Sequence, residues 1–517
     1  MATTATRSNY WIVTTTSNTT PVFNFKFVIN VYIGGVKQAQ LKQPKNNNGA
    51  AHFNIERIVK NYTKVTNKHV NTIVGTQYDS IHLMPQNIPN PTDGVYNDKV
   101  MSFNTDTLRL VTLKFYEEYA IVDGGTIAVT SSASDQIYAI MNYANEWEDL
   151  MVLDVDSYGM ETGNISKFLT KLPASTTAIN GTNGLIAHRT STNDYRVISW
   201  LNDNDYFDSD SGKYIIKFYE EPPNTTYTNY TGKISMYQDA NFGGINSGTA
   251  TTEDEMLLFA SIGGANVSKI KYFNAGNYQR TPTDKYYTAQ VNNSDLSSVS
   301  TVSVTTLKPG DYVVISFTGT TDFTLIGADD SITGTAFFAT GAGTGTGTVL
   351  IWDDEADRVS ETLLFEYADC SKFDSHTIAW KNKFGCWDYH YFDNNSSMTI
   401  NMKKETSYKK NPGSWNEVAF SLDSFERGKV QKTTGSKSLT LNTGFLVEEF
   451  NDYFKGLLQS NDVLLIQPVE VGDDAVEQKV IPLNLSTSNL KYKTQLTDKL
   501  IQYSFTFEYA HELKQYI

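Results

Sequence analysis

Cysteine is scarce in this 517-residue sequence, which contains only Cys370 and Cys386. Two cysteines cannot build a disulfide framework, so we expect free thiols in a chain synthesised in a reducing cytoplasm. Long apolar runs are also missing, because nowhere do about 18 apolar residues follow one another, and the sequence predicts no membrane span. Residues 1–13 lack the basic and apolar regions of a signal peptide.

Charged residues are few, at 19% of the chain, and acidic ones dominate, with 57 Asp and Glu against 42 Lys and Arg. The net charge is therefore -15, and no run of Lys or Arg is long enough to follow a phosphate backbone. Nucleic-acid binding depends on basic surfaces of that kind. We therefore expect no nucleic-acid partner.

Apolar residues make up 40% of the chain and aromatic residues 13%, which is enough to build substantial cores. A chain of this length exceeds what one core serves, so roughly three to four domains are expected. Asn, Thr and Ser crowd the connections, which favours turns and hairpins over long surface helices. The sequence predicts a mainly β, multi-domain protein of β-sandwich-like modules with a few short helices.

Alternation of apolar and polar residues marks the expected strands. Residues 23–33 alternate Phe, Ile and Val with Asn and Lys before Gly34 and Gly35, which predicts a strand that ends in a hairpin turn. Residues 111–119 and 463–466 are also typical of strands. Residues 501–509 have the cleanest alternation in the sequence and predict an ordered final strand.

Three segments have apolar residues at helical spacing. The first lies within residues 53–62, with Asn54 as its expected cap, and the second covers residues 136–150. The third is an apolar stripe from Leu446 to Leu458, for which Thr443 is the expected N-cap. This last segment is the strongest helix candidate.

Two short segments recur in the chain. Residues 114–118 and 217–221 both read Lys-Phe-Tyr-Glu-Glu, and residues 365–368 and 507–510 both read Phe-Glu-Tyr-Ala. Internal repeats indicate duplicated modules. Chance similarity between strands of like composition is the alternative, and the sequence leaves both open.

Residues 299–351 differ from their surroundings, because they contain almost no Lys or Arg and end in alternating Thr and Gly. No Lys-Ser or Lys-Thr follows these glycines, so they do not form a phosphate-binding loop. We expect a tight turn and an inserted β-module instead. The sequence thus predicts five modules: an N-terminal β-rich module at 1–125, a second with a short helix at 126–230, a third from 231–298 and 352–430, the insert at 299–351, and a module of helix plus strands at 431–517.

Residues that could bind a metal or act as a nucleophile are scattered. No metal-ligand spacing occurs among the seven histidines, which are His52, His69, His82, His188, His376, His390 and His511. Cys386 and His390 could be imagined as a thiol nucleophile and its base, but no catalytic motif surrounds them. We expect no metal, no cofactor and no catalytic residue.

Acidic clusters lead to the same expectation. Residues 202–212 offer oxygen ligands for calcium, yet an EF-hand register would place Phe207 and Phe218 at ligand positions, so a hairpin loop is expected. The pairs Glu117-Glu118 and Glu220-Glu221 invite comparison with glycosidases, which use two carboxylates. Neighbours on a strand point to opposite faces, however, so either pair supplies at most one inward acid. The sequence predicts a protein that is not an enzyme.

The insert resembles a small module found in structural proteins of tailed phages. The resemblance rests on Ser-Phe-Thr-Gly-Thr-Thr-Asp-Phe-Thr-Leu-Ile-Gly-Ala at residues 316–328, on residues 334–340 and on the Gly-Thr run. It covers about a tenth of the chain. In those phages the module occurs in proteins of differing roles, so it implies a virion protein without fixing its position.

A broader resemblance covers most of the sequence. The N-terminal hairpin, the Lys-Phe-Tyr-Glu-Glu strand, residues 380–388 and residues 441–510 look like a family of tail-associated proteins from phages of marine and Bacteroidetes-type hosts. Cys386 departs from the small apolar or aromatic residue expected there. The resemblance implies a structural protein in the tail region of the virion and supplies no catalytic residues.

The predicted function is therefore protein-protein contact in or near a phage tail, at a baseplate, hub, collar or fibre attachment. The expected partners are other copies of the chain and other tail proteins. The alternative is a receptor-binding tail protein that holds a host glycan. Trp147, Trp200, Trp380 and Trp387 are the candidates for stacking on sugar rings.

Overall fold

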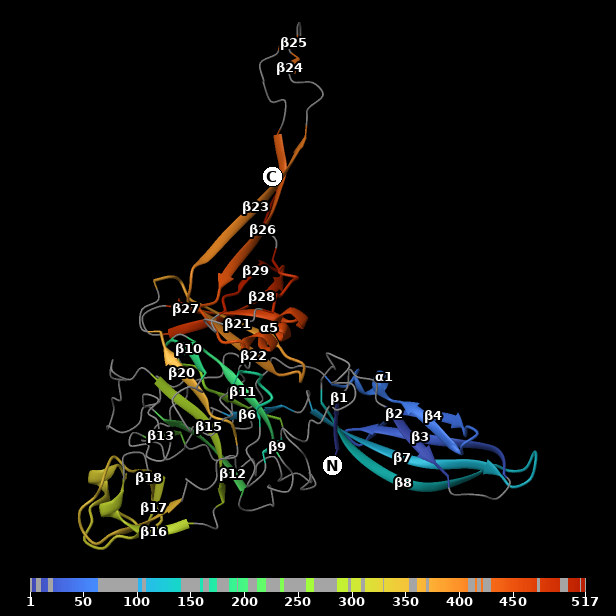
Figure 1. Cartoon of the computed structure of the whole chain (residues 1–517), viewed down its shortest axis with the longest axis horizontal. Coiled ribbons are helices and arrows are strands. Elements are labelled where there is room, and N and C mark those ends of the chain that lie inside the picture. Colours follow the sequence, from blue (N-terminus) through green and yellow to red (C-terminus); the bar gives the residue numbers. More distant parts are fainter. Residues whose placement is uncertain are drawn as a thin grey trace. The chain divides into compact units, whose positions relative to one another are not determined.

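The chain is mainly β and contains several antiparallel sheets, as the sequence predicts (Figure 1). It divides into two units, the first being Met1–Asp369 with Lys381–Tyr389 and the second Cys370–Trp380 with His390–Ile517. The computed structural model describes residues 2–5, 11–16, 22–63, 101–104, 108–140, 159–160, 167–173, 186–192, 194–202, 212–219, 233–236, 257–264, 286–295, 299–307, 312–328, 330–352, 360–368, 372–407, 414–415, 420–421, 429–471, 475–492, 501–511 and 513–516.

The N-terminal part of the first unit is a β-sandwich-like module. Its five-stranded sheet has the order β1 (Ala2–Ala5), β8 (Ala128–Ile140), β7 (Leu108–Ala120), β3 (Phe23–Ile33) and β4 (Val36–Pro44). A second layer is formed by β2 (Trp11–Thr15), β5 (Ala50–Asn54) and α1 (Glu56–Val59). Alternate residues of β3, from Phe25 to Ile33, are buried in the core between the layers, together with Phe53 and Val59.

Glycine makes the predicted turn after β3 possible. Gly34 and Gly35 have φ values of 57° and 77°, which residues with a Cβ rarely adopt. The predicted helix near residue 56 is confirmed but measures a single turn, α1. Asn54 Oδ1 accepts from the backbone N of Glu56 at 2.9 Å, although the N-cap itself is Ile55.

The helix expected at 136–150 is wrong for residues 136–140, which belong to β8. Ile137 and Ala139 are buried on one face of this strand, and β8 pairs with β7 along most of its length. Ile137 and Ala139 lie two residues apart, as the buried residues of a strand do, and the pairing with β7 selects the strand over the helical spacing. Residues 141–150 lie outside the described part of the chain.

Two further sheets follow in the first unit. One has the order β10 (Ala187–Thr190), β20 (Leu363–Tyr367), β15 (Tyr286–Asp295), β12 (Gly212–Tyr219) and β13 (Lys233–Met236). The other has the order β6 (Met101–Asn104), β14 (Leu257–Ser261), β11 (Val197–Asn202) and β9 (Gly159–Met160). The two Lys-Phe-Tyr segments both lie on interior strands, β7 and β12.

The insert has its own sheet and its own core. Its sheet order is β16 (Val299–Ser303), β19 (Thr348–Trp352), β17 (Tyr312–Phe317) and β18 (Ala336–Phe338). Two 3-10 helices, η5 (Val304–Thr306) and η6 (Phe323–Ile326), help to close the core around Phe323. The Gly-Thr run packs closely here, because a Cβ on Gly347 would lie 2.8 Å from the Phe323 ring.

An eight-stranded sheet contains most of the strands of the second unit. Its order is β22 (Trp387–Phe392), β21 (His376–Lys381), β27 (Val463–Val471), β28 (Ala475–Leu485), β29 (Ser504–Tyr509), β26 (Lys429–Asn442) and β23 (Ser396–Ser407), with β30 (Leu513–Tyr516) also paired to β26. The pair β24 (Ser414–Trp415) and β25 (Phe420–Ser421) lies between β23 and β26 in sequence. The predicted strand at 463–466 is confirmed by β27, and the one at 501–509 is confirmed by β29 from Ser504 onward.

Helix α5 (Phe450–Gln459) confirms the predicted C-terminal helix but begins later than expected. Thr443 is not its N-cap, because its hydroxyl accepts from the backbone N of Tyr503 at 2.9 Å. Leu446 likewise forms a β-bridge with Ile501. Pairing with the segment before β29 therefore occupies the residues that the apolar spacing assigned to the first helical turn.

Candidate functional sites

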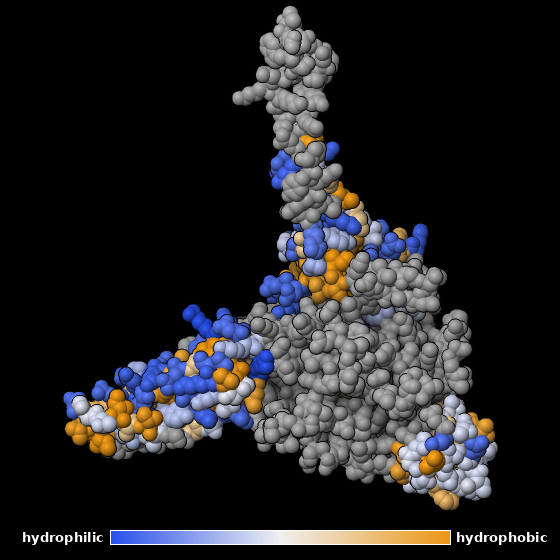
Figure 2. All heavy atoms as spheres, turned by 180° about the vertical axis from the view of Figure 1, so that it is seen from behind, coloured by the Kyte–Doolittle hydropathy of each residue, from blue (hydrophilic) through white to orange (hydrophobic). Residues whose placement is uncertain are grey.

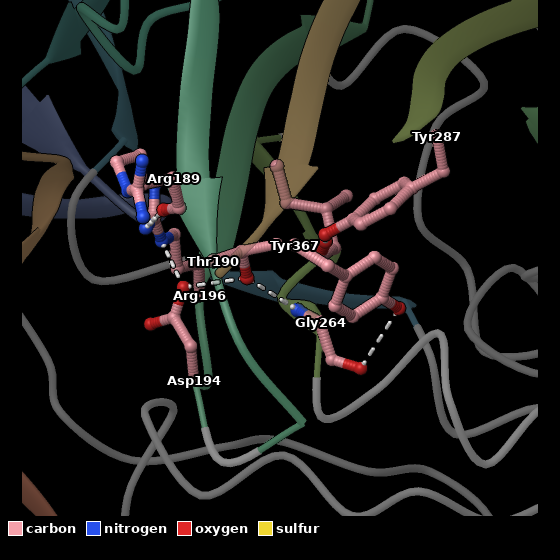
Figure 3. A network of polar contacts seen from close by, with 8 residues as sticks. Arg189, Thr190, Asp194, Arg196, Gly264, Tyr287 and Tyr367 are labelled. Carbon is pink, nitrogen blue, oxygen red and sulfur yellow. Dashed lines mark hydrogen bonds and ion pairs between the residues drawn. The ribbon is translucent and has the colours of Figure 1, made fainter. Parts of the chain in front are cut away.

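A buried ion pair lies where the chain passes from β10 to β11. Asp194 Oδ2 accepts from Arg196 Nε at 2.6 Å and from the Thr190 hydroxyl at 2.8 Å. Arg196 also donates to the backbone O of Arg189 (Figure 3). Both charged side chains of the pair are at most 1% exposed. A buried charge is costly unless it is paired and hydrogen-bonded, and here both conditions are met.

The same network joins strand ends from both sheets around it. Thr190 Oγ1 accepts from Gly264 N at 3.0 Å, and the Tyr367 hydroxyl donates to Gly264 O at 3.3 Å (Figure 3). The Tyr287 hydroxyl donates to Ile262 O at 2.8 Å. A Cβ on Gly264 would lie 2.7 Å from Thr190 Oγ1, so glycine permits this close approach. These enclosed groups act as a structural junction between strands.

Asn382 organises the turn between β21 and β22. Its Oδ1 accepts from the backbone N atoms of Phe384 at 3.0 Å and Cys386 at 3.1 Å. Its Nδ2 donates to Leu169 O at 2.8 Å and to Asp388 Oδ1 at 3.1 Å. One amide therefore fixes the turn and attaches it to the segment that contains Leu169.

Asp388 and Lys171 are ionisable groups beside this turn. The backbone N of Lys171 donates to Asp388 Oδ1 at 2.6 Å. Burial raises the pKa of Asp388 to about 7, and burial also lowers the pKa of Lys171 to about 8. Such shifts are common at catalytic sites. Asp388 is only 1% exposed, however, so its carboxyl is closed to a substrate.

Cys386 and His390 lie in surroundings unsuited to a nucleophile and its base. Cys386 is fully buried, and burial raises the pKa of its thiol, which disfavours the reactive thiolate. It belongs to the first unit and His390 to the second. The His390 ring lies against the rings of Phe392, Phe450 and Phe454, with centroids 4.7, 5.9 and 5.0 Å away.

The remaining histidines are dispersed. His188 is buried, its Nε2 lies 2.7 Å from Pro173 O, and burial lowers its pKa to about 3. Burial also lowers the pKa of His376. His52 and His511 are exposed, and His69, His82 and Cys370 lie outside the described residues. Within the described ranges, no group of three or more His, Cys, Asp or Glu residues could hold a metal ion.

The acidic clusters are only partly described. Glu118 forms an ion pair with Lys42, in which Oε1 of Glu118 lies 2.6 Å from Nζ of Lys42. Glu220, Glu221 and residues 203–211 lie outside the described residues. The glycosidase-like pair at 220–221 and the calcium loop therefore stay sequence hypotheses.

The tryptophans considered for glycan stacking are core residues wherever they are described. Trp200, Trp380 and Trp387 are at most 2% exposed. A sugar ring cannot stack on an enclosed indole, so these three do not form a glycan site. Trp147 lies outside the described residues.

An exposed apolar row lies on the hairpin of β23 and β26, and the sequence alone does not distinguish it from a buried strand face. Met398, Ile400 and Met402 are 52%, 56% and 50% exposed on one face of β23. Met398 is paired with Leu439, which is paired on its other side with Phe507, so the row continues the core face of the sheet. Figure 2 shows hydrophobic and hydrophilic residues side by side on the described part of this hairpin.

A recess in the second unit is a further candidate. It has a volume of about 450 Å³ and is lined by residues that precede β21, join β22 to β23, end β26 and lead into β29. These residues are Phe373, Asn394, Asn395, Asn442, Gln502, Tyr503 and Ser504. No local sequence signal predicts this site, because four separate segments form it.

Comparisons with protein-family models, with curated proteins and with solved structures gave no match to this chain. No helix in the described part of the chain is long and apolar enough to cross a membrane.

Proposed function

We propose that this chain is a structural protein of a tailed-phage virion, located in the tail region, that works through contacts with copies of itself and with other tail proteins. The observation that carries the proposal is the exposed apolar row on the β23–β26 hairpin. The phage-like sequence of the insert supports a location in the virion. The proposal assigns no catalytic step, in keeping with the enclosed thiol of Cys386 and the ion-paired carboxylate of Glu118.

Strand β23 is suited to protein contact for two reasons. It is the last strand in the order of its sheet, so one of its edges lies open among the described residues. Exposed edges of long strands readily pair with another chain. Its row of Met398, Ile400 and Met402 is also apolar and half exposed. Flexible Met side chains adapt well to a partner surface.

The charge distribution favours a second copy of the chain as the partner that covers this exposed row. Residues 396–442 contain eight Lys and Arg and four Asp and Glu, a net charge of +4. The net charge of the whole chain is -15, so the rest of the chain has a net charge of -19. A basic hairpin and an otherwise acidic molecule are complementary, which favours association between copies and guides their encounter.

The test measures the mass of the full chain by light scattering over a concentration series, with Ile400→Asp and Thr399→Asp compared. Thr399 is the exposed neighbour on the opposite face of β23, so it is matched in charge change and position. We expect self-association in the original chain and in Thr399→Asp, and a monomer in Ile400→Asp. Association should also weaken as salt rises from about 0.05 to about 0.5 M.

Location in the virion has its own test. Purified particles of the phage that encodes the chain should contain it, and an electron cryomicroscopy map should place it in the tail. A chain that stays monomeric at all concentrations and is missing from purified particles would overturn the proposal.

A further inference from the structure

The recess in the second unit has an uncharged and mostly polar lining. It is formed by Phe373, Asn394, Asn395, Asn442, Gln502, Tyr503 and Ser504. We propose that it is a binding site for a neutral carbohydrate of mono- or disaccharide size. Its volume of about 450 Å³ lies within the range of about 300 to 1,000 Å³ that is typical of small-ligand sites. The inference goes beyond the assembly role and does not depend on it.

The lining favours a neutral ligand with many hydroxyl groups. None of the seven lining residues is charged, and four of them carry side-chain amides. An amide offers both donors and an acceptor, which matches the sugar hydroxyl, a group that also donates and accepts. A charged ligand would lose its hydration here without gaining an opposite charge from the lining.

Two of the amides are held in orientations that leave an acceptor for a ligand. Asn442 Nδ2 donates to Asn395 O at 2.7 Å, and Asn394 Nδ2 donates to Asp393 Oδ1 at 3.2 Å. The Oδ1 atom of each is then available to accept from a ligand hydroxyl. Among the described residues, nothing hydrogen-bonds to the side-chain amide of Asn395 or to the hydroxyl of Ser504.

The aromatic residues supply a surface and a rigid wall. Phe373 is 39% exposed, and an exposed ring can face the C–H groups of a sugar. Tyr503 is buried, its hydroxyl donates to Asn451, and its backbone N donates to Thr443 Oγ1 at 2.9 Å. A wall held in this way loses little freedom when a ligand binds.

A neighbouring cation indicates which other kind of sugar could bind. Lys372 does not line the recess, but its Nζ lies 5.8 Å from the centroid of the Phe373 ring. An acidic sugar that reached this ammonium group would bind by charge and not by the amides. A comparison of neutral and acidic sugars therefore tests the chemistry directly.

The experiment is a saturation-transfer NMR screen and calorimetric titration of the full chain. The probes are neutral hexoses, N-acetylhexosamines and their disaccharides, with uronic acids as the charged comparison. We expect saturable binding of at least one neutral sugar, and an affinity about threefold to tenfold lower in each of Asn395→Ala and Gln502→Ala, which delete one hydrogen-bonding side chain. Phe373→Ala should weaken binding as well.

Asn401→Ala is the matched control, because Asn401 is an exposed amide of the same unit on β23 and does not line the recess. It should leave the affinity unchanged, and all variants should unfold at the same temperature. No saturable binding of any neutral sugar up to about 10 mM would overturn the proposal. Preference for uronic acids, or equal affinity in Asn395→Ala, Gln502→Ala and the original chain, would overturn it too.

Discussion

Strands β23 and β29 flank the same strand, β26, and differ in what covers them. Phe505 and Phe507 of β29 are at most 1% exposed, whereas Met398 and Ile400 of β23 are about half exposed, although Met398 and Phe507 flank Leu439 in one cross-strand row. Helix α5 explains the difference, because the ring of its Phe454 packs on Phe505, with centroids 5.0 Å apart. Alternation specifies which face of a strand is apolar. What lies over that face decides whether it is core or surface.

The largest effect should come from removing the buried ring of Phe507, at the covered end of the cross-strand row of Met398, Leu439 and Phe507. Phe507→Ala should lower the free energy of unfolding by about 3 to 5 kcal/mol, because a large buried ring is lost and a cavity is left. Urea denaturation followed by fluorescence measures the change. Glu508→Gln is the control on the next residue and should shift stability by no more than about 0.5 kcal/mol. Equal effects of the two would contradict the assignment of Phe507 to the core.

Burial should also decide how much an ion pair contributes to stability, as a buried pair and an exposed pair on the β23–β26 hairpin show. Asp194→Asn should cost about 3 to 5 kcal/mol, because it leaves the buried charge of Arg196 without its partner. Glu405→Gln removes the exposed partner of Lys432, whose Nζ lies 3.8 Å away, and should cost less than about 1 kcal/mol. Denaturation midpoints of both variants check the prediction. A small effect of Asp194→Asn would mean that water reaches the Arg196 guanidinium.

Asp388 should make stability fall as pH rises. Burial raises its pKa in the folded chain to about 7, above the ordinary value of 3.8, so the folded state holds a proton that the unfolded state has lost. Its contribution is fully present below about pH 3.8 and is lost as pH rises through about 7. Asp388→Asn should therefore gain stability relative to the original chain across this window.

Unfolding midpoints between pH 4 and pH 8 measure that difference. His188 has the opposite sign, because its pKa is lowered to about 3 and its contribution is lost as pH falls. Both proteins retain His188, so its contribution cancels in the comparison. A difference that stays constant over the whole range would show that Asp388 is ionised and solvated in the folded chain.

The inserted module should be removable with little effect on the rest. Its core is its own cluster, and Ser303 is paired with Thr348, so the ends of the segment lie on neighbouring strands. A deletion of residues 302–349 with a short linker should leave a chain that still unfolds cooperatively by calorimetry. Loss of the cooperative transition would show that the segment is integral to the first unit.

Sequence reasoning succeeds where the signal is local. The alternation of β3 and β29 and the paired glycines after β3 each specify their own structure. It fails where distant segments decide the outcome. Thr443 has the side chain of an N-cap, yet its hydroxyl binds the backbone of Tyr503, 60 residues away.

The candidate sites illustrate the same limit. Asp194 and Arg196 lie two residues apart with no motif around them, and their network is completed by Gly264 and Tyr367 from distant strands. The recess likewise draws its lining from four segments. The large rings of tryptophans suit sugars, but large rings also release the most free energy on burial, and the described tryptophans are enclosed.

The smallest effect on stability is expected at Met398, the uncovered end of the cross-strand row of Met398, Leu439 and Phe507. Met398→Ser should change the free energy of unfolding by no more than about 0.5 kcal/mol, because the half-exposed side chain loses little when it becomes polar. Self-association should fall all the same, since the proposed contact between copies uses this side chain. Urea denaturation at a concentration where the chain is monomeric, together with light scattering at high concentration, separates the two quantities. If Met398→Ser destabilised the monomer as strongly as Phe507→Ala, another part of the same chain would have to cover β23. The exposed row would then belong to the core, and the proposal that a second copy covers it would fail.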